Sequence, residues 1–314
     1  MRKVITVPTG LAICLALAIV ILLVRCFLDR GKVRCPSFAQ SSSATTVTAE
    51  RGSGFFSNCC CRLGAIIEYY NSKGSLPEVV DSSDSWRWYK PFETAPDVTF
   101  EYFMDYRSLS KPSPLPQRPV PFDINWTQFE PYATLAFPQL VPFVQLYFSP
   151  SAQIRALTAM IEEKYELSPS DAFCLFHRGN DKVMETAVPD HAAYLDRFEA
   201  KAAKTPSRST VVVQSDETEF LGMARARLEA LGWRVVIFEA EIRHMKSDAT
   251  STVDAGGVAE DRPNSLFSKY FIAIIFIMSR CAEVFLATGN CQLWVALFRG
   301  HAEGVHQWKD GAWL

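Results

Sequence analysis

A regular alternation of strand-like and helix-like segments after Ser151 constrains the fold more than any other feature of the sequence. Alternation at this spacing implies parallel strands joined by right-handed crossovers. The sequence therefore predicts a doubly wound parallel sheet in an α/β domain over residues 151–314. The predicted strands are residues 172–176, 210–214, 234–238 and 283–286, and the predicted helices are residues 152–166, 191–204, 218–231, 266–280 and 291–298.

Length and charge narrow the class of protein. The chain has 314 residues, of which 48% are hydrophobic, and 32 Lys and Arg against 34 Asp and Glu give a formal net charge of −2. A chain of this size buries one large core or two modest ones. Domains that bind nucleic acid by neutralising phosphates usually carry a clear basic excess, so the charge balance argues against a nucleic-acid partner.

An apolar segment near the N-terminus predicts a single membrane span. Residues 4–24 carry no charge, and at 1.5 Å per residue they are long enough for a hydrocarbon core of about 30 Å. We expect a signal-anchor helix over residues 1–28, with a cleaved signal peptide or an organelle transit segment as the alternatives. The Lys and Arg on the two sides favour a cytosolic C-terminal side if anything, so charge does not predict a lumenal domain.

Two further regions precede the predicted sheet. Residues 29–53 are rich in Ser, Thr and Ala and lack a hydrophobic period, which predicts a flexible stem. Residues 54–150 are expected to form a smaller N-terminal α/β subdomain on the acceptor side. Nine of the 18 prolines lie between Pro112 and Pro150, and proline lacks the amide donor that helices and central strands need. That stretch is predicted to be an irregular connection.

Cysteines and one glycosylation sequence bear on the compartment. Asn125 begins the only Asn-x-Ser/Thr sequence of the chain and is the predicted glycan acceptor, which is compatible with lumenal exposure. Disulfides among the nine cysteines are possible in a secretory compartment, but their pairing cannot be read. The run at residues 59–61 lacks zinc-ligand spacing, so no metal site is predicted.

A polar cluster follows the first predicted strand, at the carboxyl end where ligands of open α/β sheets bind. It spans residues 177–182 and contains Arg178, whose planar guanidinium suits bidentate phosphate binding. Asp181 and Lys182 lie in the same cluster and are expected to pair with or orient it. The combination predicts a phosphate-binding loop, in which His177 is structural rather than catalytic.

Two more clusters follow later strands. Asp216 and Glu217 come directly after residues 210–214. Thr288, Gly289 and Asn290 stand between a strand and a helix, where the helix N-terminus presents unpaired amides to an anion. Each cluster alone could be an ordinary polar turn, but three at strand ends favour an anion-binding site.

The wording of these clusters resembles the nucleotide-binding half of GDP-fucose-dependent α1,6-fucosyltransferases. The similar segments are RGNDKVMET, VVVQSDET and ATGNC, and the wording of RGNDK, QSDETEF and TGNCQLW is similar to that of uncharacterised algal and giant-virus proteins of the same type. The resemblance covers residues 170–314 and reaches weakly into residues 54–91. It implies a GT-B-like fold.

The resemblance also implies roles for the clustered residues. Arg178 matches an arginine that grips the nucleotide β-phosphate, and Asp181 and Lys182 match the Asp-Lys of the family signature. Glu185, one residue out of register, matches the candidate base, with Tyr194 nine residues beyond it as in the family. The residues that match nucleotide contacts or the phosphate loop are Asp216, Glu217, Thr288, Gly289 and Asn290.

The chain departs from the family at Gly179, where a second arginine is expected, and at Phe176, where a histidine is expected. These departures bear on the donor sugar more than on the nucleotide-binding fold. An exposed ion pair at residues 181 and 182, and a solvated carboxylate at Glu185, are the alternatives to a catalytic role.

The resemblance implies an inverting glycosyltransferase that transfers fucose from GDP-fucose to a glycan or glycoprotein without a metal cofactor. It implies a single-pass membrane protein of the Golgi or endoplasmic reticulum, with a lumenal catalytic domain. A transferase for another nucleotide sugar, and an inactive membrane-anchored nucleotide- or sugar-binding protein, are the alternative functions.

Overall fold

A computed structural model describes residues 43–47, 54–86, 89, 97, 99–179, 182, 185–204, 209–241 and 264–314. The predicted signal-anchor and most of the predicted stem lie outside these residues. Within the described ranges, no helix is both long enough and apolar enough to cross a membrane.

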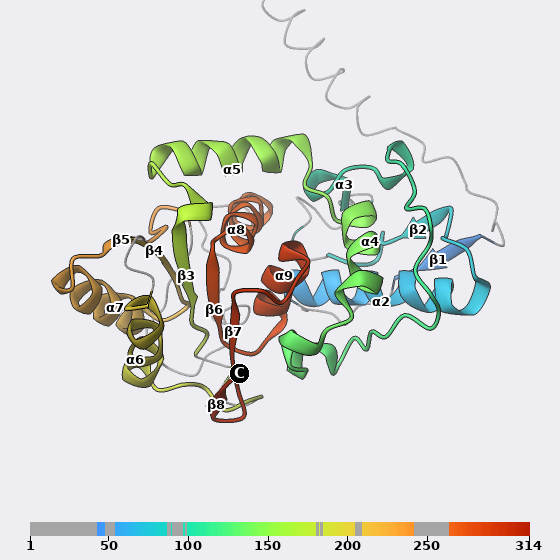
Figure 1. Ribbon diagram of the computed structural model, residues 1–314. Helices are drawn as coiled ribbons and strands as arrows, with labels where there is room; N and C mark the ends of the chain where they lie inside the picture. Colours follow the sequence, from blue (N-terminus) through green and yellow to red (C-terminus); the bar gives the residue numbers. More distant parts are fainter. Residues whose placement is uncertain are drawn as a thin grey trace, which may run out of the picture. The chain divides into compact units, whose positions relative to one another are not determined.

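A six-stranded mixed sheet in the order β5-β4-β3-β6-β7-β8 organises the C-terminal half (Figure 1). β3 to β7 run parallel, and β8 pairs antiparallel with β7. The four predicted strands are confirmed as β3 to β6, although β5 ends two residues early. The strands are β3 (Ala172–Phe176), β4 (Thr210–Gln214), β5 (Arg234–Val236), β6 (Glu283–Leu286), β7 (Val305–Lys309) and β8 (Ala312–Trp313).

Helices cover both faces of this sheet, as the predicted doubly wound arrangement requires. α6 (His191–Ala202) and α7 (Thr218–Ala230) lie on one side, and α8 (Asn264–Ser279) and α9 (Asn290–Arg299) on the other (Figure 1). Successive side chains of a strand point to opposite faces. Accordingly, Phe173 of β3 packs with α6 and α7, and Cys174 packs in the core that contains α8 and α9. α5 (Ala152–Lys164) packs along α8.

The N-terminal half begins with a strand-helix-strand unit. β1 (Ala44–Thr46) and β2 (Val79–Asp81) pair in parallel, and α2 (Phe55–Lys73) connects them along the chain. β1 corrects part of the predicted stem: Val47 is fully buried, and its amide donates to the Asp81 carbonyl at 2.8 Å. Composition alone hides a three-residue strand, because Ser and Thr typical of a stem also occupy exposed strand positions.

The proline-rich stretch is only partly irregular. It includes α4 (Phe137–Tyr147), which has Pro138 in its first turn, where the missing amide costs no helical hydrogen bond. The remaining elements are α3 (Thr99–Tyr102) and the 3₁₀ turns Tyr106–Ser108, Thr127–Phe129, Tyr132–Thr134 and Pro169–Asp171.

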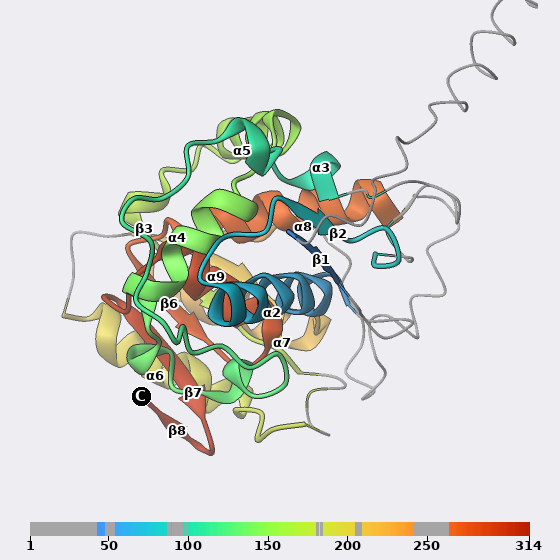
Figure 2. The same cartoon turned by 90° about the vertical axis from the view of Figure 1, so that its right-hand side faces the viewer.

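One hydrophobic core crosses the predicted subdomain boundary at residue 150. α2 and α4 both contact α9. In Figure 2, which views the structure from the side on which α2 lies, α2 is in front of α9. The ring of Trp294 on α9 lies 4.6 Å from that of Phe148 and 6.2 Å from that of Phe56, centroid to centroid. Residues 292–297 are consecutively buried, so α9 is packed all round and its position is fixed by both halves of Ser43–Leu314.

Candidate functional site

The carboxyl ends of β3 and β6 lie at the point where the order of the strands along the chain reverses. β3 leads through α6 to β4 on one side, while β6 pairs with β3 on the other. Ligands of open α/β sheets bind at such a point. The first and third predicted clusters follow these two neighbouring strands, and the structure brings them together.

Lys182 and Gly289 make the contact between these clusters. A methyl group added at Gly289 would lie 3.3 Å from Cε of Lys182 and 3.0 Å from Oε1 of Gln292. The backbone of Gly289 has φ 154° and ψ 172°, a conformation that favours glycine. A side chain at this position would therefore be strained and would intrude between the lysine and the helix.

Gln292 is the functional candidate that the sequence did not reveal. It is fully buried in the first turn of α9, and neither its Nε2 nor its Oε1 has a hydrogen-bond partner among the described residues. Leaving a buried polar group without a partner costs about 1–3 kcal/mol. Its place beside Gly289 and Lys182 favours a ligand that supplies the missing bonds. In the sequence, the only indication of a function for Gln292 is that it is a polar residue in a largely apolar helix.

Tyr132 closes the loop before α9 from the N-terminal half. Its hydroxyl donates to the Gly289 carbonyl at 3.0 Å and lies 3.2 Å from the Gly289 amide, which donates to it. The Gly289 amide, predicted to face a phosphate, is therefore already bonded. Anion binding at this terminus then depends on the following amides of α9, since the first amides of a helix have no intrahelical partner.

Arg178 is held by Asp216 from the next strand. Nη1 of Arg178 lies 2.8 Å from Oδ2 of Asp216, and the Gly179 amide donates to Oδ1 of the same carboxylate at 2.9 Å. Asp216 is only 6% exposed. Asp216 therefore positions the loop that carries Arg178. The resemblance predicts a different role for Asp216, a direct contact with the nucleotide.

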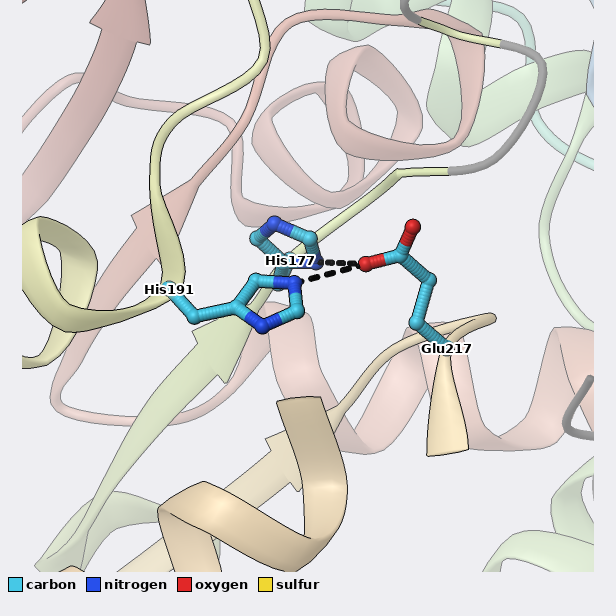
Figure 3. Close-up of side chains that lie close together, drawn as sticks. All are labelled: His177, His191 and Glu217. Carbon is cyan, nitrogen blue, oxygen red and sulfur yellow. Dashed lines mark hydrogen bonds and ion pairs between the residues drawn. The ribbon is translucent and has the colours of Figure 1, made fainter. Parts of the chain in front are cut away.

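Glu217 likewise turns inward. Its Oε2 accepts a hydrogen bond at 2.8 Å from Nε2 of His191, and lies 3.8 Å from Nδ1 of His177 (Figure 3). A methyl group at Gly179 would lie 2.1 Å from the Glu217 carboxyl group, so a side chain there would require that carboxyl group to move. The prediction that Glu217 contacts the nucleotide finds no support in this inward position.

His177 is part of the folded interior. It is fully buried, stacks on Phe220 at 4.3 Å between ring centroids, and has Nδ1 3.1 Å from Oγ of Ser215. Burial lowers the pKa of the His177 imidazole to about 4, the charge of His191 acts in the same direction, and the nearby carboxylates oppose it. The ring is neutral near pH 7, as a structural histidine is expected to be.

Glu185 lies beside Lys182. Its Oε2 is 2.5 Å from Nζ of Lys182, and its side chain is 41% exposed against 11% for the lysine. Glu185, the predicted base, therefore lies next to Lys182, the predicted phosphate contact, and forms an ion pair with it. Asp181, the other predicted member of this loop, lies outside the described residues.

Two residues predicted to contact the nucleotide, Tyr194 and Thr288, bond to the protein backbone instead. Tyr194 is fully buried, and its hydroxyl donates to the carbonyls of Phe176 and Phe285 at 3.1 and 2.6 Å, which fixes the ends of β3 and β6. Burial raises the pKa of the Tyr194 phenol. A nucleotide contact by Tyr194 finds no support in this position. Thr288 donates to the Trp308 carbonyl at 2.6 Å.

Asn290 and Asn125 remain at or near the surface. The side-chain oxygen of Asn290 accepts a hydrogen bond from the Cys60 thiol at 3.2 Å, which links α9 to α2. Asn125 is exposed, as a glycan acceptor must be, while Thr127 of the same sequence is buried and accepts from the Asp123 amide at 2.8 Å. Glycosylation of Asn125 stays a prediction.

Comparison with known proteins gives no family for this chain. No protein-family model matches it, and no curated protein matches it. The fucosyltransferase resemblance therefore rests on the quoted motifs, and a function has to be argued from the geometry of the site.

Proposed function

We propose that this protein is an inverting glycosyltransferase that binds a nucleotide sugar where β3 and β6 end. The observation that carries the proposal is the meeting of Lys182, Gly289 and Gln292 at the N-terminus of α9, where the Gln292 amide has no hydrogen-bond partner among the described residues. A cation, a glycine and a helix N-terminus together suit a diphosphate. The resemblance of the motifs adds GDP-fucose as the donor.

In this proposal the diphosphate lies between the cationic loop and α9. Arg178 and Lys182 neutralise the charge that grows on the leaving nucleoside diphosphate, and the first-turn amides of α9 add hydrogen bonds. The Nε2 group of Gln292 donates a hydrogen bond to a phosphate oxygen. Asp216 keeps Arg178 in place through the 2.8 Å ion pair. No metal is assigned to this chemistry.

Glu185 is the proposed base. It removes the proton of an acceptor hydroxyl while that oxygen attacks the anomeric carbon and the bond to the diphosphate breaks. Its ion pair with Lys182 gives the reaction an order, since a diphosphate bound to Lys182 competes for the lysine and releases the carboxylate. The acceptor, a glycan or glycoprotein, then meets an unpaired base only when the donor is present.

A binding protein without catalysis is the second candidate. It is favoured by the same 2.5 Å ion pair, because a carboxylate bonded to a lysine is not free to accept the proton of an acceptor hydroxyl. Use of another nucleotide sugar is favoured by Gly179, which leaves the cationic loop with one arginine fewer than the family signature.

The proposed fold is GT-B-like, and the proposed location is the lumen of the Golgi or endoplasmic reticulum. We place the chain among GT-B-like transferases because a parallel β1-α2-β2 unit accompanies the six-stranded sheet. The apolar residues 4–24 support a single-pass anchor, and the family resemblance together with Asn125 favours the Golgi or endoplasmic reticulum lumen for the described part. Protease treatment of sealed microsomes tests the side: protection supports the lumen, and digestion without detergent places the domain in the cytosol.

Calorimetric titration of the full chain with GDP and UDP tests the nucleotide assignment. We expect GDP to bind more tightly, and Arg178→Ala to weaken GDP by on the order of 1.5–3 kcal/mol, or ~10- to 100-fold. Arg225→Ala is the matched control, because that arginine pairs with Glu239 on the exposed surface. Unchanged GDP affinity in Arg178→Ala would end the assignment.

A further inference from the structure

Two histidines and a glutamate from three different elements converge behind the Arg178 loop. His177 follows β3, His191 is the first residue of α6, and Glu217 is the N-cap of α7. Their ligand atoms all lie within 4.8 Å of one another. Figure 3 shows both imidazoles directed at the same carboxylate oxygen. We call these three residues the His-His-Glu cluster.

The separations in this cluster suit a small metal ion. Zn²⁺ takes nitrogen and oxygen ligands at about 2.0–2.2 Å in a tetrahedron, so neighbouring ligand atoms lie about 3.4 Å apart. Oε2 of Glu217 is 2.8 Å from Nε2 of His191 and 3.8 Å from Nδ1 of His177. These two distances fall on either side of the required one, and shifts of less than about 1 Å would equalise them.

The donor set, two imidazoles and one carboxylate, favours transition-metal ions. Two imidazoles and one carboxylate bind Zn²⁺ in sites with three protein ligands, and the same set binds Fe²⁺. The side chains of His177, Glu217 and His191 are 0, 9 and 24% exposed. A divalent cation would supply the positive charge that a buried carboxylate favours.

Two of the three ligands are held in position by their surroundings. Phe220 stacks on the His177 ring, and the absence of a side chain at Gly179 admits the Glu217 carboxyl group. The hydrogen bonds to His191 and Ser215 already occupy the same atoms, so a purely hydrogen-bonded cluster is the competing explanation. A measurement of metal binding distinguishes a metal site from a purely hydrogen-bonded cluster.

We propose that the His-His-Glu cluster binds one divalent transition-metal ion, with Zn²⁺ as the ion that its donor set favours. The ion would tie the loop after β3 to the starts of α6 and α7, and so brace both the loop that carries Arg178 and the turn after β4 that carries Asp216. This departs from the sequence prediction of no metal, because ligands at positions 177, 191 and 217 have none of the short spacings of a zinc motif.

The test uses the full chain, stripped with a chelator and dialysed, and titrated with Zn²⁺ alone against a chromophoric competitor. We expect one Zn²⁺ per chain and a thermal midpoint that rises with added Zn²⁺. His191→Ala removes the most exposed ligand and should weaken Zn²⁺ at least ~100-fold and abolish the rise. It also avoids His177, whose buried ring is needed for folding.

His306→Ala is the matched control. His306 also pairs with a carboxylate, Glu283, at 2.9 Å and is comparably shielded, but among the described residues it belongs to no three-ligand group. It should leave the stoichiometry and affinity for Zn²⁺ unchanged. Failure of the wild type to bind Zn²⁺, or equal losses in both variants, would overturn the proposal. Either result leaves the GDP titration of Arg178→Ala as a separate test of the proposed function.

Discussion

At the scale of single residues, charge compensation decides which side chains face a ligand. Asp216 and Glu217 are adjacent acids at the end of β4, yet the arginine and imidazole groups around them turn both inward. Lys182 and Gln292 are left at the edge of the sheet, one paired with an exposed carboxylate and the other without a hydrogen-bond partner in the described structure. In the proposed function, these two residues bind the diphosphate at this edge.

Replacing Glu185 with Gln separates catalysis from binding. Loss of the base should slow sugar transfer by ~10²–10⁴-fold. GDP affinity should stay the same or rise slightly, because Lys182 loses its competing carboxylate. Transfer assays and GDP titrations measure the two effects, with Glu229→Gln on the exposed end of α7 as the control. Near-full transfer in Glu185→Gln would place the base elsewhere, with Asp181 of the same loop next.

Gln292→Met keeps the length of the side chain and removes its polar atoms. Since the amide has no partner to lose among the described residues, we expect the free energy of unfolding to rise by about 1 kcal/mol. GDP affinity should fall at least roughly 10-fold as the hydrogen bond from Nε2 to the charged diphosphate disappears.

Gln307→Met is the matched contrast, because Gln307 accepts from the Tyr132 amide at 2.7 Å and donates to Thr288 and Glu130. That variant should lose about 1–3 kcal/mol of stability. A Gln292→Met protein that is destabilised, yet binds GDP normally, would remove Gln292 from the site.

At the scale of elements, α9 connects the two halves to the site. α2 and α4 pack on its outer side and the sheet on its inner side, so its N-terminus has little freedom to move. A rigid helix terminus is a preorganised anion site, which needs no rearrangement when the ligand arrives. Gly289, the residue before the helix, has no side chain to separate Lys182 from Gln292.

Gly289→Ala should close the site and strain the backbone. The new methyl group would meet Gln292 and Lys182 in a conformation that alanine disfavours, with an expected loss of about 1–3 kcal/mol and of GDP binding. Gly222→Ala is the control, because Gly222 lies inside α7 with nothing within 4 Å and should gain about 0.5–1 kcal/mol. Denaturant unfolding compares the two, and an equal response would argue against strain at Gly289.

Sequence patterns predict the elements that are long, periodic or fully apolar. β3 and β4 are continuous apolar runs, and both were located to the residue. β7 was missed because its polar residues alternate in no clear pattern, although Asp310 and Gly311 form the kind of two-residue turn that joins hairpin strands. α4 was missed because prolines suggested irregular chain.

At the scale of the whole molecule, the strand order decides which polar clusters meet. The sequence predicts three clusters at strand ends, but strand order is a long-range property that periodicity does not contain. Pairing of β3 with β6 brings Lys182 to Gly289 and gives Tyr194 its two carbonyl partners. Pairing of β3 with β4 brings Asp216 to Arg178. The inward roles of these residues, and the part played by Tyr132 from a distant segment, therefore could not be predicted.

Hydrogen exchange across the full chain, with and without GDP, tests the central claim most directly. The account predicts that GDP slows exchange at the first-turn amides of α9, residues 290–292, and in the loop after β3 at Arg178 and Gly179. The β7-β8 turn at Asp310 should exchange at the same rate in both samples. GDP binding without slower exchange at the start of α9, or with protection confined to the N-terminal half, would contradict it.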